Sequence, residues 1–139
     1  MTQEDKELLL KDLCARLPYK VKGQAVSNGE IYRISSIISV SPSGESLLML
    51  DNNNIDFVTL EQTKPYLRPM SSMTEEEKKE IKPLFSKFTD EFGKRVLVVR
   101  QNKMVLYQDW LNAHHFDYRG LIEKGLALEA PKRMYEIQN

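Results

Sequence analysis

The residues best suited to chemistry lie close together near the C-terminus: His114, His115, Asp117 and Arg119 fall within one short segment. A histidine beside a carboxylate is typical of general acid–base or hydrolytic catalysis. One hypothesis is therefore a small hydrolase centred on His114, His115 and Asp117, which requires these groups to converge in a cleft. The alternative, which we favour, is that one histidine packs near Trp110, the other faces water, and Asp117 caps a short helix.

Other signatures of catalysis are missing from the sequence. Adjacent residues point about 100° apart on a helix and to opposite faces of a strand, so His114 and His115 are badly placed to bind one metal ion. The serines lack a Gly-x-Ser-x-Gly elbow, and the six glycines are scattered rather than clustered in a phosphate-binding loop. Cys14, the single cysteine, is expected on the apolar stripe of a helix, where a thiol is inert. We therefore expect a protein that is not an enzyme, with no catalytic residue, metal site or cofactor.

A second candidate site is a cluster of basic residues around an expected hairpin: Lys94, Arg95, Arg100 and Lys103, with Tyr107 as an aromatic stacking surface. Basic side chains interleaved with aromatic ones are typical of nucleic-acid binding. The alternative is a hairpin in which charged and apolar residues alternate, so that one face is polar and the other apolar. The nearby Asp90 and Glu91 favour this alternative, because their negative charges offset the basic residues. Nucleic-acid binding through this hairpin is kept as the alternative function.

Composition narrows the class of protein. The chain has 139 residues, enough for one domain of ordinary size, with 41% hydrophobic and 29% charged residues. Twenty basic and twenty acidic side chains leave no net charge that would attract a polyanion. A polar, acidic N-terminus, one cysteine and apolar runs far shorter than a membrane span predict a cytoplasmic protein with no membrane association.

The N-terminal half predicts a helix followed by an antiparallel β-meander. Thr2 is a helix N-cap with Asp5 at the matching position, and Pro18 ends the helix. Short turn-bounded runs then favour strands that pair antiparallel, because helical crossovers have no room. The expected strands are residues 20–26, 31–40, 47–50 and 55–60, and the expected turns are residues 28–29, 41–44 and 51–54.

The C-terminal half predicts more helix, beyond a boundary at residues 64–73 that two prolines and two serines mark. Thr74 and Glu77 form a capping box for a helix that continues, despite Pro83, to about Phe92. A second hairpin is expected from residues 95–100 and 104–107, followed by two short helical pieces at residues 110–111 and 121–122, with Gly125 ending the second. The tail from Met134 carries no docking signal.

These elements predict the α+β class: an N-terminal helix, a small antiparallel meander or partly open barrel, then a helix-rich part with a second hairpin. The expected division is residues 1–70 and 71–139, packed as one compact unit.

Three segments resemble a family of small proteins encoded in gut-bacterial genomes and prophages. They are residues 8–17 (LLLKDLCARL), 64–74 (KPYLRPMSSMT) and 110–131 (WLNAHHFDYRGLIEKGLALEAP). The resemblance implies a bacterial or phage protein from mobile DNA, and it brings no activity, ligand or catalytic residue with it. Together with the missing catalytic signatures, it leads us to expect a non-enzymatic binding or accessory protein whose partner is another protein, with homo-oligomers also compatible with the open sheet edges.

Overall fold

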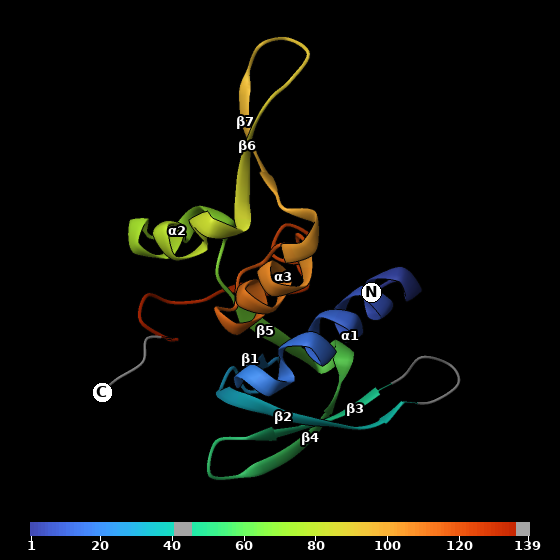
Figure 1. Cartoon of the computed structure of the whole chain (residues 1–139). Helices are drawn as coiled ribbons and strands as arrows, with labels where there is room; N and C mark the ends of the chain where they lie inside the picture. Colours follow the sequence, from blue (N-terminus) through green and yellow to red (C-terminus); the bar gives the residue numbers. More distant parts are fainter. Residues whose placement is uncertain (41–45, 136–139) are drawn as a thin grey trace.

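The computed structural model describes residues 1–40 and 46–135, so the turn expected at residues 41–44 lies outside the described residues. The chain has the α+β architecture that the sequence predicts: a six-stranded mixed sheet, an N-terminal helix across it, and a C-terminal part with further helices and a separate two-stranded hairpin (Figure 1). The sheet does not close into a barrel.

The sheet begins with the predicted meander and gains two strands that were not predicted. Its strands are β1 (Lys22–Ala25), β2 (Ile31–Val40), β3 (Ser46–Asp51), β4 (Ile55–Thr59), β5 (Thr63–Leu67) and β8 (Leu128–Glu129). Their order is β4-β3-β2-β1-β5-β8, with only the β5–β8 pair parallel. Gly29 and Asn53, in the turns before β2 and β4, both have the positive φ that tight turns require.

The strand β5 occupies the predicted boundary. Pro65 favours a break in a strand because it lacks an N–H group. Here Pro65 lies opposite Gly23 in the β1–β5 pair. Val26 N–H donates to the Gln62 carbonyl, and hydrogen-bonded and non-hydrogen-bonded residue pairs alternate along antiparallel strands. Pro65 and Gly23 are therefore a non-hydrogen-bonded pair, and the Pro65 nitrogen points away from β1. On that side β8 pairs only from Tyr66 onward, so no ladder bond is lost at the proline.

The helix α1 (Gln3–Arg16) starts at the predicted capping box, in which Thr2 and Asp5 bond reciprocally. Its buried stripe is Leu9, Asp12, Leu13 and Arg16. The prediction that Cys14 lies on this stripe is wrong: the thiol is exposed. The spacing of the apolar residues predicted a buried stripe of Leu10, Leu13, Cys14 and Leu17. The observed stripe is rotated by one residue, because Asp12 and Arg16 form an ion pair and are buried together.

The helix α2 (Glu75–Ile81) also starts at its predicted capping box, Thr74 with Glu77, but it does not continue to Phe92. The chain passes through a 3-10 turn, η4 (Lys82–Leu84), that contains Pro83, and then extends as β6 (Phe85–Thr89). Pro83 has no N–H to donate, so it ends the α-helical hydrogen-bond pattern. Residues 85–89 therefore extend as a strand, although the spacing of Phe85, Phe88 and Phe92 is helical.

The predicted second hairpin exists with a different partner strand. Its strands are β6 and β7 (Arg95–Val99), paired antiparallel. Residues 104–107, predicted as a strand, instead open the helix α3 (Met104–Ala113), which also contains the predicted helical piece at Trp110. The four apolar residues there are too few for their period to distinguish the two structures.

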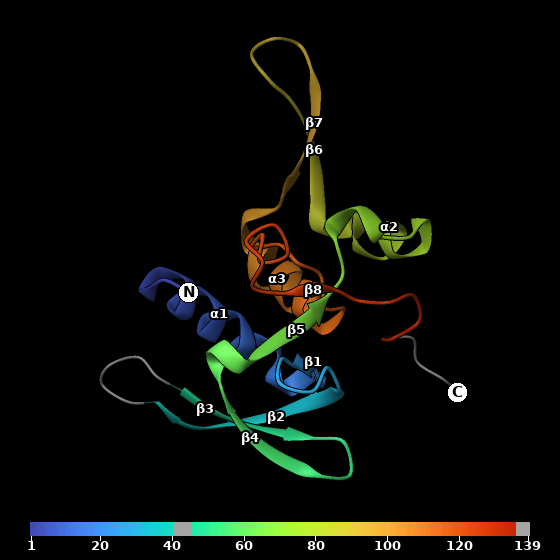
Figure 2. The ribbon, with the colours of Figure 1, turned by 180° about the vertical axis from the view of Figure 1, so that it is seen from behind.

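The hydrophobic core draws on both halves of the chain. Leu9 and Leu13 of α1 pack with Leu48 and Leu50 of β3, and Leu121 from the C-terminal part belongs to the same buried cluster. The ribbon shows α1 crossing one face of the sheet, with α3 beside it near β5 (Figures 1 and 2). Within residues 1–40 and 46–135, no helix is both long and apolar enough to span a membrane.

Candidate functional site

Both histidines of the predicted polar cluster are engaged in packing. His114 follows the last residue of α3, and its Nδ1 lies 2.9 Å from the Trp110 carbonyl oxygen while its ring stacks on the Trp110 indole. His115 has a positive φ of 62°, which turns the chain, and its ring stacks on Tyr135 with 3.7 Å between centroids. His114 therefore packs on Trp110 as expected, whereas His115 is buried rather than facing water.

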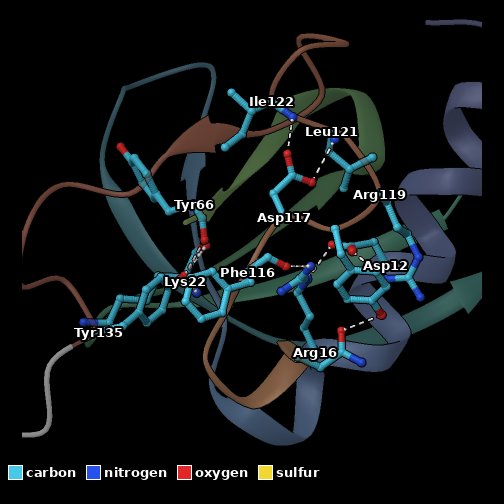
Figure 3. Close-up of polar contacts among 12 residues, drawn as sticks. Asp12, Arg16, Lys22, Tyr66, Phe116, Asp117, Arg119, Leu121, Ile122 and Tyr135 are labelled. Atoms are coloured by element: carbon cyan, nitrogen blue, oxygen red, sulfur yellow. Dashed lines mark hydrogen bonds and ion pairs between the residues drawn. The ribbon is translucent and has the colours of Figure 1, made fainter. Parts of the chain in front are cut away.

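Asp117 binds backbone groups. Its two carboxylate oxygens accept hydrogen bonds from the N–H groups of Leu121 (2.9 Å) and Ile122 (3.0 Å) (Figure 3). This is the capping role predicted for Asp117, although residues 121–125 form turns instead of a helix. Gly125 ends this turn with a φ of 73°, the left-handed conformation that glycine adopts easily.

Arg119 belongs to a buried charge cluster with Asp12 and Arg16 of α1. Asp12 accepts from Arg16 Nε at 2.8 Å and from Arg119 Nη1 at 2.7 Å. Arg16 Nη2 also donates to the Phe116 carbonyl oxygen at 2.5 Å (Figure 3). Both side chains of the Asp12–Arg16 pair are 0% exposed. The cluster therefore fastens α1 to the C-terminal segment and offers no free carboxylate.

The structure thus brings the predicted groups into one region without making them converge as a catalytic set. Burial lowers the pKa of His115 to about 3, and the positive charges of Arg16, Arg68 and Lys22 act in the same direction. His115 is therefore neutral at pH 7. Across the described residues 1–40 and 46–135, no three His, Cys, Asp or Glu side chains gather closely enough to hold a metal ion.

The C-terminal tail docks through Tyr135, which the sequence did not indicate. The Tyr135 hydroxyl accepts from the Lys22 N–H (2.8 Å) and donates to the Tyr66 carbonyl oxygen (2.7 Å) (Figure 3). Burial raises the pKa of Tyr135, so the hydroxyl keeps its proton. The side chain bridges β1 and β5 from outside the sheet while its ring covers His115.

Tyr135→Phe is expected to lower the free energy of unfolding by about 1–3 kcal/mol, because it keeps the stacked ring but removes the partner of two backbone groups. Urea unfolding followed by circular dichroism measures this loss. Tyr107→Phe is the matched control, since the Tyr107 hydroxyl bonds no described residue, and its effect is expected to stay within about 0.5 kcal/mol. Equal effects of the two substitutions would contradict the bridging role.

The basic residues predicted to bind nucleic acid lie at two levels of the β6–β7 hairpin. Lys94 and Arg95 lie beside its turn, whereas Arg100 and Lys103 lie at its base. Arg95 and Arg100 differ by an odd number of positions along an extended chain, so their side chains point to opposite faces. Tyr107, on α3, makes an edge contact with the Phe85 ring at 5.1 Å.

The same hairpin carries the largest group of exposed apolar side chains. Figures 1 and 2 show β6 and β7 extending away from the rest of the molecule. We define the hairpin surface as the exposed apolar residues of β6, β7 and their turn, with the first turn of α3: Phe88, Phe92, Leu97, Val98, Met104, Val105 and Leu106. Phe92 is 85% exposed, Val105 69% and Leu97 65%. These side chains lie on both faces of the hairpin, since Leu97 and Val98 are consecutive residues of β7. Exposed apolar groups of this size mark interaction sites.

Apolar residues are also exposed on β4, at the edge of the six-stranded sheet, where Ile55 and Phe57 face solvent. Ile55 lies opposite Asp51, which pairs with Arg33 at 3.9 Å. The strand β4 is part of the six-stranded sheet, whereas the β6–β7 hairpin projects from the body of the molecule (Figure 1), which makes the hairpin surface the better candidate site.

Comparison with known proteins adds no relative from which a function could be transferred. No family model, no curated protein and no solved structure matches this chain. The fold and the site define an α+β protein with a projecting hairpin that carries exposed apolar side chains.

Proposed function

We propose that this chain is a non-enzymatic binding protein that docks a protein partner through the hairpin surface. The exposure of Phe92 and Leu97 on a projecting hairpin, and of Val105 on the helix at its base, carries this proposal. Exposed aromatic and aliphatic anchors supply most of the binding free energy when a partner removes them from water. The packing and capping roles of His114, His115 and Asp117 support a binding role over hydrolysis.

A protein partner accounts for this surface better than a nucleic acid does. Nucleic-acid sites are dominated by cations that contact phosphates, with aromatic rings free to stack on bases. On the hairpin, the acidic Asp90 and Glu91 lie at the turn beside Lys94 and Arg95, and apolar side chains occupy the strand faces. We also propose that the protein is located in the cytoplasm. We propose that it originates from a phage or other mobile DNA and has an accessory role there.

The test is site-specific photocrosslinking of the full chain in a bacterial lysate. A photoreactive benzoylphenylalanine replaces Leu97 in one variant and Ile55 in the other, since both positions are similarly exposed. We expect discrete protein adducts from position 97 only, because docking holds a partner against the hairpin. Equal, diffuse labelling from both positions would refute the proposal, and nucleic-acid adducts that disappear with added salt would favour the alternative function.

A further inference from the structure

The hairpin is a two-stranded sheet with two open edges. Among residues 1–40 and 46–135, β6 and β7 pair only with each other. A two-stranded hairpin alone is marginally stable in water. An aromatic contact between Phe85 and Tyr107 joins the base of the hairpin to the body. Addition of further strands would therefore stabilise the projecting part.

Hydrogen bonds at both ends fix which backbone groups of the hairpin point outward. Arg100 N–H donates to the Leu84 carbonyl oxygen, and Asp90 N–H donates to the Lys94 carbonyl oxygen, each at 2.9 Å. In an antiparallel pair, hydrogen-bonded and non-hydrogen-bonded residue pairs alternate. The even-numbered residues of both strands therefore bond across the hairpin, and the odd-numbered residues direct their N–H and C=O groups to the open edges.

Lys87 and Leu97 are the central outward-directed residues of the two edges, and they lie directly opposite each other. The edge of β6 has the charged Lys87 at its centre, so two copies paired through β6 would place two lysines together. A charge of this kind protects an edge strand from pairing. The edge of β7 has Val96, Leu97 and Val98 at its centre, which are uncharged residues that favour strands.

We infer that the partner of the hairpin surface is a second copy of this chain, paired antiparallel through β7 to form a continuous four-stranded sheet. This inference rests on the proposed function and names its partner. A two-fold axis near Leu97 makes the pairing self-complementary, as a closed dimer requires. It supplies partners for the outward N–H and C=O groups of Leu97 in both copies.

The same arrangement accounts for the two remaining parts of the hairpin surface. In an antiparallel pair, the turn of each hairpin lies beside the base of the other. Phe92, in the turn, thereby approaches the first turn of α3 in the second copy, where Met104, Val105 and Leu106 are exposed. The contact occurs twice by symmetry, so the pairing covers the most exposed aromatic side chain and the exposed end of α3 together.

The experiment is analytical ultracentrifugation of the purified full chain over a range of concentrations. We expect wild-type dimers that dissociate on dilution, and at least tenfold weaker association for Leu97→Pro. Proline at position 97 removes an N–H that points outward, so the β6–β7 hydrogen bonds are retained. Lys87→Pro is the matched control, at the same level of the opposite edge, and it is expected to remain dimeric.

A second variant, Leu97→Lys, tests the same edge without proline by placing like charges near the two-fold axis, and it is also expected to be monomeric. Circular dichroism checks that each variant is folded. A wild-type chain that stays monomeric throughout, or a dimer lost with Lys87→Pro but kept with Leu97→Pro, would overturn the inference. If the chain is monomeric but still gives discrete adducts from position 97, the dimer inference is refuted and the proposed function is supported. If it is monomeric and gives no such adducts, both the inference and the proposed function are refuted.

Discussion

Asp12→Ala is expected to lower the free energy of unfolding by about 3–5 kcal/mol, because it leaves buried positive charge without its counterion. Asp12 and Arg16 are both 0% exposed, and Asp12 also accepts from Arg119. An ion that lacks its partner inside a protein keeps the full cost of its lost hydration. Urea unfolding of the variant and the wild type measures the difference.

Two further variants separate burial from simple loss of charge. Glu61→Ala removes a carboxylate that also pairs with α1, through Lys6 at 2.9 Å, but Glu61 is exposed to solvent, so its loss is expected to cost far less than the loss of Asp12. Replacing the buried pair by Asp12→Leu with Arg16→Met is expected to recover part of the stability lost in Asp12→Ala, since an apolar pair replaces the buried ion pair while Arg119 and the Phe116 carbonyl each lose a partner. An Asp12→Ala cost as small as that of Glu61→Ala would contradict the importance of the cluster.

Lowering the pH from 7 to 5 is expected to reduce the free energy of unfolding by about 2 kcal/mol through His115 alone. Its pKa of about 3 in the folded chain lies below the ordinary value of 6.5, so the unfolded chain binds a proton that the folded chain excludes. Stability from this group is complete above pH 6.5 and is lost as the pH falls toward 3. The range between pH 5 and 7 isolates it, because ordinary carboxylates titrate at lower pH.

His115→Asn tests this assignment, since asparagine tolerates the left-handed backbone found at position 115. The variant is expected to be less stable at pH 7, where it loses the stacking on Tyr135, but to show a flat stability profile from pH 7 to 5. His114→Asn is the control and is expected to keep the wild-type slope. If the slope disappeared with His114→Asn and persisted with His115→Asn, the assignment would be wrong.

Local signals in the sequence predicted much of the fold. The capping boxes at Thr2 and Thr74 and the turns before β2 and β4 are encoded within a few residues, so they can be predicted without tertiary information. The end of α2 was harder, since Phe85, Phe88 and Phe92 follow helical spacing and only the pairing of residues 85–89 with β7 makes this segment extended. Pro83 was the available signal, and giving it more weight would have ended the helix correctly.

The sites depend on contacts between distant residues, which explains why the sequence indicated them poorly. Asp12 and Arg16 read as an ordinary helical surface pair, because their spacing by four residues is equally common on exposed faces. Their burial follows from contacts with Phe116 and Arg119, which lie 100 and 107 positions away along the chain. The hairpin surface was missed for a different reason. Residues 97–98 were correctly assigned to a strand, but Phe88 and Phe92 were assigned to a helix and residues 104–106 to a strand, so the exposure of the surface as a whole could not be anticipated.

The long sequence separation of the Arg16 contacts has a consequence for how the chain folds during synthesis. While the ribosome is still adding residues beyond β5, α1 and the meander are complete, but Arg16 lacks the Phe116 carbonyl and Asp12 lacks Arg119. Docking α1 on the sheet at that stage would bury polar groups without all their partners, which disfavours it. We therefore expect α1 to stay loosely attached to the nascent chain until the C-terminal segment emerges, so that its final packing is among the last events of folding.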